Sequence, residues 1–273
     1  MKCILSTFLI LSFTFFGFSN NQNVPVDTAG FTKLKAVLVI GPVQDLTSYF
    51  IKEMNKIGDF LEQKGVVVHK FYDDAAVWED IKAAANDANF FIYSGHGTTM
   101  GANSVSGGLC IDRTISSKTM TEGFKLHDNA LVIFKSVCRG AGSSASDDSD
   151  IGIKEAVKRV TDYSGPFFTI GAASYYANNF GNGCLSFLEN FFNGKTIIEC
   201  HAESSGRYTI EVAKEYMHDQ DKQISITSHQ STGVSTRTTY TNGEKTVEKV
   251  PSIKEYEIAY VGNPDYSINH LMK

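Results

Sequence analysis

The middle of the chain alternates between short apolar runs and longer segments whose apolar residues recur at helical spacing. Buried strands are expected where apolar, β-branched or aromatic residues run together, at residues 36–40, 66–68, 89–93, 130–134, 167–171 and 256–261. Helices are expected between them, at residues 49–61, 77–86, 118–124, 153–163, 185–192 and 197–216. Gly65 is placed to close the first helix.

Strands separated by helices of this length pair in parallel through right-handed crossovers. We therefore expect an α/β fold, a three-layer α/β/α sandwich with a mainly parallel central sheet. Two segments depart from the alternation. A glycine-rich stretch at residues 104–111 predicts a hairpin, and residues 224–250, which alternate in polarity and contain Asn242-Gly243, predict an exposed hairpin excursion.

The N-terminal segment has the pattern of an export signal. Lys2 precedes an apolar stretch at residues 3–18, and the small residues Gly17 and Ser19 precede polar ones. We expect a cleavable signal peptide over residues 1–19, a linker over residues 20–34 and one domain over residues 35–273. A membrane anchor is the alternative, but the run is short for a span. A secreted or periplasmic protein without a membrane span in its mature form is therefore expected.

Composition narrows the classes of function. With 273 residues, 42% of them hydrophobic, the chain can bury a sizeable core. A formal net charge of −5 argues against a nucleic-acid partner, which needs a basic face. The histidines lack metal-ligand spacing, so no metal or cofactor is expected. Export permits disulfides, and Cys184 with Cys200 is a candidate pair.

Two predicted central strands end in a reactive side chain beside glycine. His96 follows one strand within Ser-Gly-His-Gly, and Cys138 follows another within Ser-Val-Cys-Arg-Gly. Alone, a cysteine after a strand is more often an inert apolar residue. Because ligands collect beyond the carboxyl ends of parallel strands, two neighbouring strands with these ends bring imidazole beside thiol. The pattern predicts a cysteine hydrolase.

These motifs resemble those of the caspase-like cysteine peptidases, the group that includes caspases, metacaspases, legumains, clostripains and gingipains. The resemblance covers residues 35–193 and extends more weakly to Tyr-Val-Gly-Asn-Pro near residue 262. It implies a caspase-like fold, a Cys-His dyad and a protein or peptide substrate. It makes Cys138 the nucleophile and His96 the general base, with the backbone N–H groups of Gly97 and Cys138 as the oxyanion hole.

The chemistry explains why such residues are needed together. A free thiol with an ordinary pKa of about 8.5 is only slightly ionised at neutral pH, so a nearby imidazole or oriented amides must favour the thiolate. A donor to the developing oxyanion is worth about 2.7–4 kcal/mol in the rate, and a backbone donor needs loop geometry that glycine permits.

Candidates for substrate binding follow three of the predicted strands. Asp45, after the first strand, could receive a lysine or arginine side chain through a charge-assisted pair, or could simply begin the following helix. Ser136 stands two positions before the nucleophile, where clostripains and metacaspases tend to have aspartate. This difference leaves cleavage after a basic residue open. Ser174, after the strand expected at residues 167–171, is a candidate for the pocket wall.

Other interpretations remain beside the peptidase. A secreted binding or adaptor protein could retain the fold without turnover, and a serine α/β-hydrolase is disfavoured because no Gly-x-Ser-x-Gly follows a strand. Asp147, Asp148 and Asp150 could hold calcium or a basic substrate, or form a solvated loop. Cys110 and His127 follow no central strand and are expected to be structural.

Overall fold

The structure is a computed structural model that describes residues 34–100, 105–205, 208–213, 222–230, 235–241, 244–250 and 252–273. The expected signal peptide at residues 1–19 lies outside the described residues, as does nearly all of the linker expected at residues 20–34.

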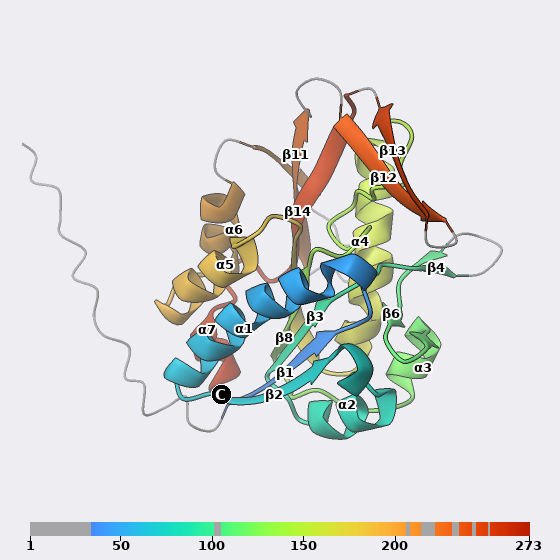
Figure 1. The fold of residues 1–273 in the computed structure, drawn as a ribbon. Coiled ribbons are helices and arrows are strands. Elements are labelled where there is room, and N and C mark those ends of the chain that lie inside the picture. Colours follow the sequence, from blue (N-terminus) through green and yellow to red (C-terminus); the bar gives the residue numbers. More distant parts are fainter. Residues whose placement is uncertain are drawn as a thin grey trace, which may run out of the picture.

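Eight of the described strands form one sheet in the order β10-β11-β14-β9-β8-β3-β1-β2 (Figure 1). Five of them run parallel to their neighbours: β1 (Lys35–Ile40), β2 (Val67–Tyr72), β3 (Phe90–Ser94), β8 (Ala130–Lys135) and β9 (Ala172–Asn178). Three extend the sheet in antiparallel fashion: β14 (Lys254–Gly262), β11 (Gln223–Gln230) and β10 (Thr209–Ala213). The fold is mixed α/β with a large, mostly parallel central sheet, as expected.

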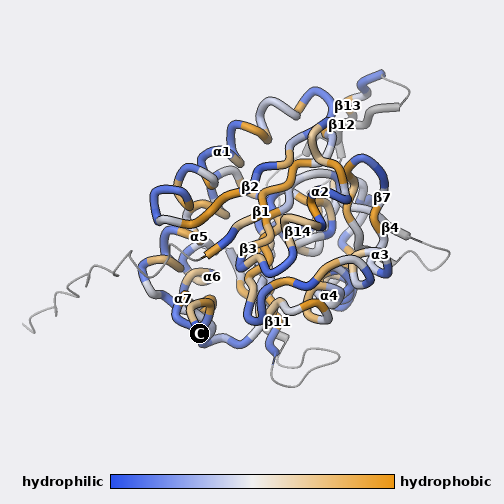
Figure 2. Tube along the Cα trace, turned by 90° about the horizontal axis from the view of Figure 1, so that it is seen from below, coloured by the Kyte–Doolittle hydropathy of each residue, from blue (hydrophilic) through white to orange (hydrophobic). Residues whose placement is uncertain are grey.

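Helices cover both faces of this sheet, and one hydrophobic core lies between the sheet and the helices on each face. One face carries α2 (Trp78–Ala85), α3 (Ser117–Thr121) and α4 (Gly152–Thr169). The other carries α1 (Thr47–Gln63), α5 (Gly183–Phe192), α6 (Ile197–Ser205) and α7 (Ile268–Leu271). In Figure 2 the strands in the middle are largely hydrophobic, whereas α1 changes between hydrophilic and hydrophobic along its length. Each helix therefore buries one side against the sheet.

Short elements complete the described chain. The 3₁₀ helices are η2 (Gln44–Leu46) and η3 (Asp73–Ala75). Three two-stranded sheets are formed by β4 (Thr99–Met100) with β5 (Val105–Ser106), β6 (Leu109–Cys110) with β7 (Thr114–Ile115), and β12 (Ser235–Thr241) with β13 (Glu244–Val250).

Alternate residues of strand β8 pack into the two hydrophobic cores on opposite faces of the sheet. Val132 and Phe134 pack with α4, while Leu131 and Ile133 face the α1 and α5 side. All four are fully buried. Burying a side chain of this kind contributes about 1.5–3 kcal/mol, so an uninterrupted apolar strand is stabilised from both faces.

The strand expected at residues 167–171 is wrong. Helix α4 continues to Thr169, and the strand begins at Ala172. Val160, Tyr163 and Phe167 recur at helical spacing and are buried against the sheet, which extends the helix beyond residue 163. Gly171, with φ of +113°, makes the turn into β9.

Two expectations near the C-terminal half also need correction. The helix expected at residues 197–216 ends at Ser205, and the β-branched stretch from Thr209 forms the edge strand β10 instead. The excursion expected at residues 224–250 starts later, because Ile224 and Ile226 are buried and hold β11 in the central sheet. Strands β12 and β13 do pair in antiparallel fashion, and Asn242-Gly243, the predicted turn, lies outside the described residues.

A buried histidine links α6 to β11. The His201 side chain is 1% exposed, its Nε2 lies 3.2 Å from the Ser225 hydroxyl, and no described residue bonds to its Nδ1. Burial lowers the pKa of His201 from 6.5 to about 4. The ring is therefore neutral in the folded protein at neutral pH.

We expect His201 to make folding sensitive to acid. Its pKa of about 4 in the folded state lies below the unfolded value of 6.5. The unfolded state thus binds the proton more tightly, and stability that is complete above pH 6.5 is lost as the pH falls towards 4. At pH 5 the loss from this group is about 2 kcal/mol. Urea titrations at pH 7 and pH 5 should show a smaller drop in unfolding free energy for His201→Gln than for the unmodified chain.

The exposed His69 provides the matched control. His69→Gln should keep the full pH dependence. An equal drop in all three proteins would contradict the role assigned to His201.

Candidate active site

The carboxyl ends of four parallel strands meet at one edge of the sheet. Ile40 of β1 pairs with Ser94 of β3, Ser94 with Lys135 of β8, and Lys135 with Asn178 of β9. Whatever follows these residues is therefore held side by side. His96 comes two residues after β3, so this register carries it towards the segment that follows β8.

The loops that carry His96 and Cys138 are in direct backbone contact. A Cβ atom added to Gly97 would lie 1.9 Å from the Cys138 carbonyl oxygen, closer than any side chain permits. Only glycine allows this approach. The structure thus brings together the segments that carry the imidazole and the thiol, as the sequence predicted.

Tyr163 of α4 fixes the far side of this contact. The Thr98 N–H donates to the Tyr163 hydroxyl at 2.7 Å, and that hydroxyl donates to the Thr98 carbonyl at 3.2 Å. Burial raises the pKa of Tyr163, so its hydroxyl keeps its proton at neutral pH. The loop after β3 is therefore fastened to the helix that packs beneath it.

Tyr93, the penultimate residue of β3, supports the histidine loop from below. Its buried hydroxyl lies 3.0 Å from the carbonyl oxygens of His96 and Cys110, and it accepts the Cys110 N–H at 3.1 Å. Burial raises the pKa of Tyr93, which keeps the hydroxyl a donor. Cys110, expected to be structural, thus contributes its backbone to this support.

Cys138 lies in a tight turn between two residues with left-handed backbone. Ser136 has φ of +55° and Arg139 has φ of +68°. The turn is closed by the Gly140 N–H, which donates to the Val137 carbonyl at 2.9 Å, and by the Arg139 N–H, which donates to Ser143 at 2.7 Å. Side chains seldom adopt such φ values, and residues held in them cluster at functional sites. Cys138 thus lies in a turn held between two residues with unfavourable backbone conformations.

Two backbone N–H groups beside this contact have no acceptor among the described residues. Among the described residues, nothing accepts a hydrogen bond from the N–H of Gly97 or of Cys138. His96 is exposed and Cys138 is partly exposed. Within the described part of the chain, the His96 ring also has no hydrogen-bonding partner. The edge therefore offers an accessible thiol, an accessible imidazole and unused backbone donors.

The loop that follows Cys138 is anchored by a buried ion pair. Arg159 of α4 donates to both carboxylate oxygens of Asp147, at 2.8 and 3.0 Å, and to the Gly142 carbonyl at 3.1 Å. Asp147 also accepts the Ser144 N–H at 2.7 Å. Asp147, one of the three aspartates considered for calcium, is thus engaged in an ion pair with Arg159. Among the described residues, no His, Cys, Asp and Glu side chains gather in a way that could hold a metal ion.

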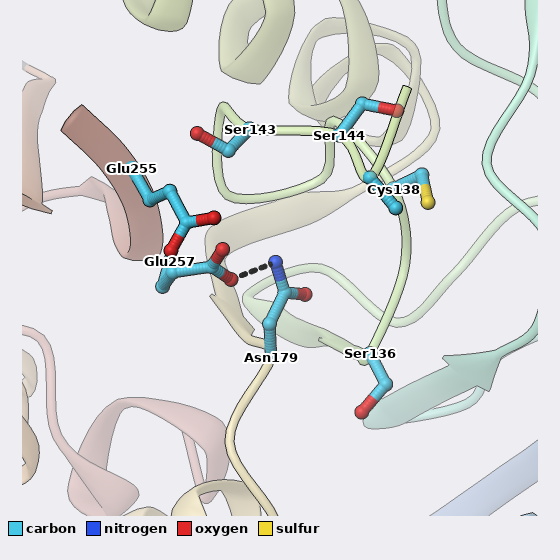
Figure 3. A pocket seen from close by; sticks show the side chains of 8 residues that line it. Ser136, Cys138, Ser143, Ser144, Asn179, Glu255 and Glu257 are labelled. Atoms are coloured by element: carbon cyan, nitrogen blue, oxygen red, sulfur yellow. Dashed lines mark hydrogen bonds between the residues drawn. The ribbon is translucent and has the colours of Figure 1, made fainter. Parts of the chain in front are cut away.

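A pocket opens beside the Cys138 turn (Figure 3). Its volume is about 260 Å³. Three segments line it besides the turn itself: the loop at residues 143–145, the end of β9 and the start of β14. The lining residues are Ser136, Cys138, Ser143, Ser144, Ala145, Asn179, Glu255 and Glu257.

The three predicted substrate-binding residues have different positions. Ser136 lines the pocket. Asp45 is exposed in η2, after β1, and is not part of the lining. Ser174 pairs with Leu131 at the opposite end of β8 and β9, is fully buried, and donates to the Val261 carbonyl at 3.1 Å. The expectation for Ser174 fails because β9 starts later than predicted.

Sequence reasoning missed Asn179, Glu255 and Glu257. Asn179 directly follows the true end of β9, so a correct strand boundary would have indicated it. Glu257 is a carboxylate between the apolar residues Tyr256 and Ile258 of β14, a pattern that itself marks a special position. Tyr93 and Tyr163 carried no signal beyond that of core residues.

The cysteines of the described chain remain free thiols. The pairing considered for Cys184 and Cys200 is therefore wrong. Cys184 lies on α5 and Cys200 on α6, each packed in the core, and burial raises the pKa of both to about 12. They are inert, unlike the accessible Cys138.

No protein-family model and no curated protein matches the chain. Among the described helices, none has the length and apolarity needed to cross a membrane.

Replacing Gly97 should separate the two loops. Gly97→Ala places a methyl group where the Cys138 carbonyl lies, and such overpacking costs about 1–3 kcal/mol of unfolding free energy. Gly181→Ala is the matched control, because its Cβ would meet only the Tyr49 hydroxyl, at 3.9 Å. Urea denaturation measures both changes. Equal stability of the two variants would show that the loops are not in this contact.

Proposed function

We propose that this chain is a secreted or periplasmic caspase-like cysteine endopeptidase with Cys138 and His96 as its dyad. The observation that carries the proposal is the contact between Gly97 and the Cys138 carbonyl, which brings the two reactive loops together at the carboxyl edge of a mostly parallel sheet. The order of the His-Gly and Cys-Arg-Gly motifs supports the caspase-like assignment.

The proposed reaction begins with transfer of the Cys138 proton to the His96 imidazole. The thiolate attacks the peptide carbonyl carbon, and the carbonyl π electrons move to oxygen. The resulting oxyanion accepts hydrogen bonds from the N–H groups of Gly97 and Cys138, whose lack of other partners among the described residues supports this role. His96 then donates the proton to the leaving amine as the C–N bond breaks.

The second half returns the enzyme to its starting state. A water molecule gives a proton to His96 and attacks the thioester carbonyl carbon. The C–S bond then breaks, the acid product forms, and the departing Cys138 thiolate takes the proton from His96. Every step uses groups of this chain and water. The requirement that both amides keep their direction explains why the loops are fastened by Tyr93 and Tyr163, because a preorganised donor loses no energy to reorientation.

Hydrolysis should depend on Cys138 and His96 and on no other thiol. With a peptide library as substrate, Cys138→Ala should remove iodoacetamide-sensitive cleavage, and His96→Gln should lower kcat about 10²- to 10⁴-fold through loss of the general base. Cys110 is also partly exposed, so Cys110→Ala is a matched control and should stay active. Unchanged cleavage by Cys138→Ala would refute the mechanism. Absence of cleavage by the unmodified mature chain would favour a binding or adaptor protein.

A further inference from the structure

The pocket beside Cys138 separates the nucleophile from a pair of carboxylates. Figure 3 shows Cys138 at one side of the pocket and the carboxylates of Glu255 and Glu257 at the opposite side, with Asn179 and Ser136 below. The volume of about 260 Å³ is several times the roughly 30 Å³ that one water molecule takes up in the liquid. A side chain on the residue acylating Cys138 would have to be long to reach the carboxylates.

Asn179 adds an unused acceptor to these carboxylates. Its Nδ2 donates to Glu257 Oε2 at 2.5 Å, and its Oδ1 is buried without a donor from any described residue. In Figure 3 this oxygen points away from Glu257, towards the side where Ser136 and Cys138 lie. A buried acceptor without a partner is costly, so this oxygen favours a ligand that brings N–H donors.

Among the described residues, no lysine or arginine side chain lines the pocket. Several charged or titratable groups lie beside the lining. His229 Nε2 of β11 is 3.4 Å from Glu255, and Asp147 is paired with Arg159. The Arg139 guanidinium donates to Ser146 at 3.2 Å, and Lys254 Nζ lies 5.4 Å from the centre of the Tyr256 ring. Burial, with the nearby charges of Glu255 and Asp147, raises the pKa of Glu257 to about 7, against the opposing effect of the Asn179 hydrogen bond. The described lining of the pocket therefore carries two carboxyl side chains and no lysine or arginine.

We propose that this pocket binds the lysine or arginine side chain of the residue whose carbonyl Cys138 attacks, with Glu257, Glu255 and Asn179 as its specificity residues. The inference rests on the proposed peptidase function and assigns its substrate class. The residues proposed to recognise a basic side chain are therefore on β14, whereas the sequence had suggested Asp45. The long aliphatic stem spans the pocket from Cys138, and the cationic end meets the carboxylates and the Asn179 oxygen.

The sharpest test compares arginine with citrulline, an uncharged residue of nearly the same shape, at the position before the scissile bond. The unmodified protein should cleave the arginine peptide with the higher kcat/KM. Glu257→Gln should reduce that preference about 10- to 100-fold, the value of one or two hydrogen bonds to a charged group. Glu255→Gln should reduce it less, because His229 already engages that carboxylate.

The exposed Glu244 of β13 supplies the matched control, and Glu244→Gln should retain the full preference. Equal cleavage of the two peptides by the unmodified protein, or an unchanged preference in Glu257→Gln, would overturn the pocket assignment and leave the peptidase proposal standing. A basic preference only after the scissile bond would overturn it as well.

The ratio of the two kcat/KM values should also depend on pH. Because the pKa of Glu257 is about 7, this group is mostly protonated at pH 6 and mostly charged at pH 8. The arginine preference should therefore rise between these pH values, whereas ionisation of the dyad affects both peptides and cancels in the ratio. In Glu257→Gln the ratio should be nearly flat.

A binding measurement separates this inference from the peptidase function. Agmatine, which carries the arginine guanidinium without a scissile bond, should raise the melting temperature of the unmodified protein and of Cys138→Ala, but not that of Glu257→Gln. If no peptide is cleaved while this pattern holds, the peptidase proposal falls and the cation pocket remains. If agmatine stabilises none of the proteins, or stabilises Glu257→Gln equally, the pocket assignment falls.

Discussion

The close approach of the Gly97 backbone to the Cys138 carbonyl is the constraint on which the site depends. Parallel pairing of β3 with β8 sets the ends of the two strands beside each other, and the missing side chain at Gly97 lets the loops after them touch. A larger residue at Gly97 would push the loop that carries His96 away from the Cys138 turn. The geometry of the site is thus a consequence of strand register combined with one small residue.

Buried hydroxyl groups of core residues fix the loops at this edge of the sheet through hydrogen bonds to their backbone. Tyr93 and Tyr163 lie in the core beneath the loops, and their hydroxyls bond to backbone groups around His96 and Thr98. Arg159 and Asp147 do the same for the loop after Cys138. Stabilising contacts of this kind balance the left-handed backbone at Ser136 and Arg139. The proposed cation pocket uses the same frame, since its walls are the Cys138 turn and the ends of β9 and β14.

Much of this architecture could be predicted from the sequence, because buried parallel strands are continuous apolar runs. The strands before His96 and Cys138 are such runs, and their chain order implied the shared edge. Where polar and apolar residues mix, the local sequence pattern predicted the wrong element boundaries. Helix α4 extends to Thr169 and β9 begins only at Ala172. Ser174 therefore lies near the start of β9 and not beyond its end, and the position of Asn179 after the strand was not recognised. Glu257 meets Asn179 only through antiparallel pairing of β14 with β9, which sequence spacing does not encode.

The most direct test of the central claim is a chemical cross-link between the two reactive side chains. In 1,3-dibromoacetone, two bromides can be displaced in turn, one by a thiolate and one by a neighbouring imidazole, and the link forms only when the two groups share one cleft. Peptide mapping by mass spectrometry should find Cys138 joined to His96 in the unmodified mature protein, and singly alkylated Cys138 in His96→Gln. Singly alkylated Cys138 in the unmodified protein, or a link to another histidine, would contradict the account.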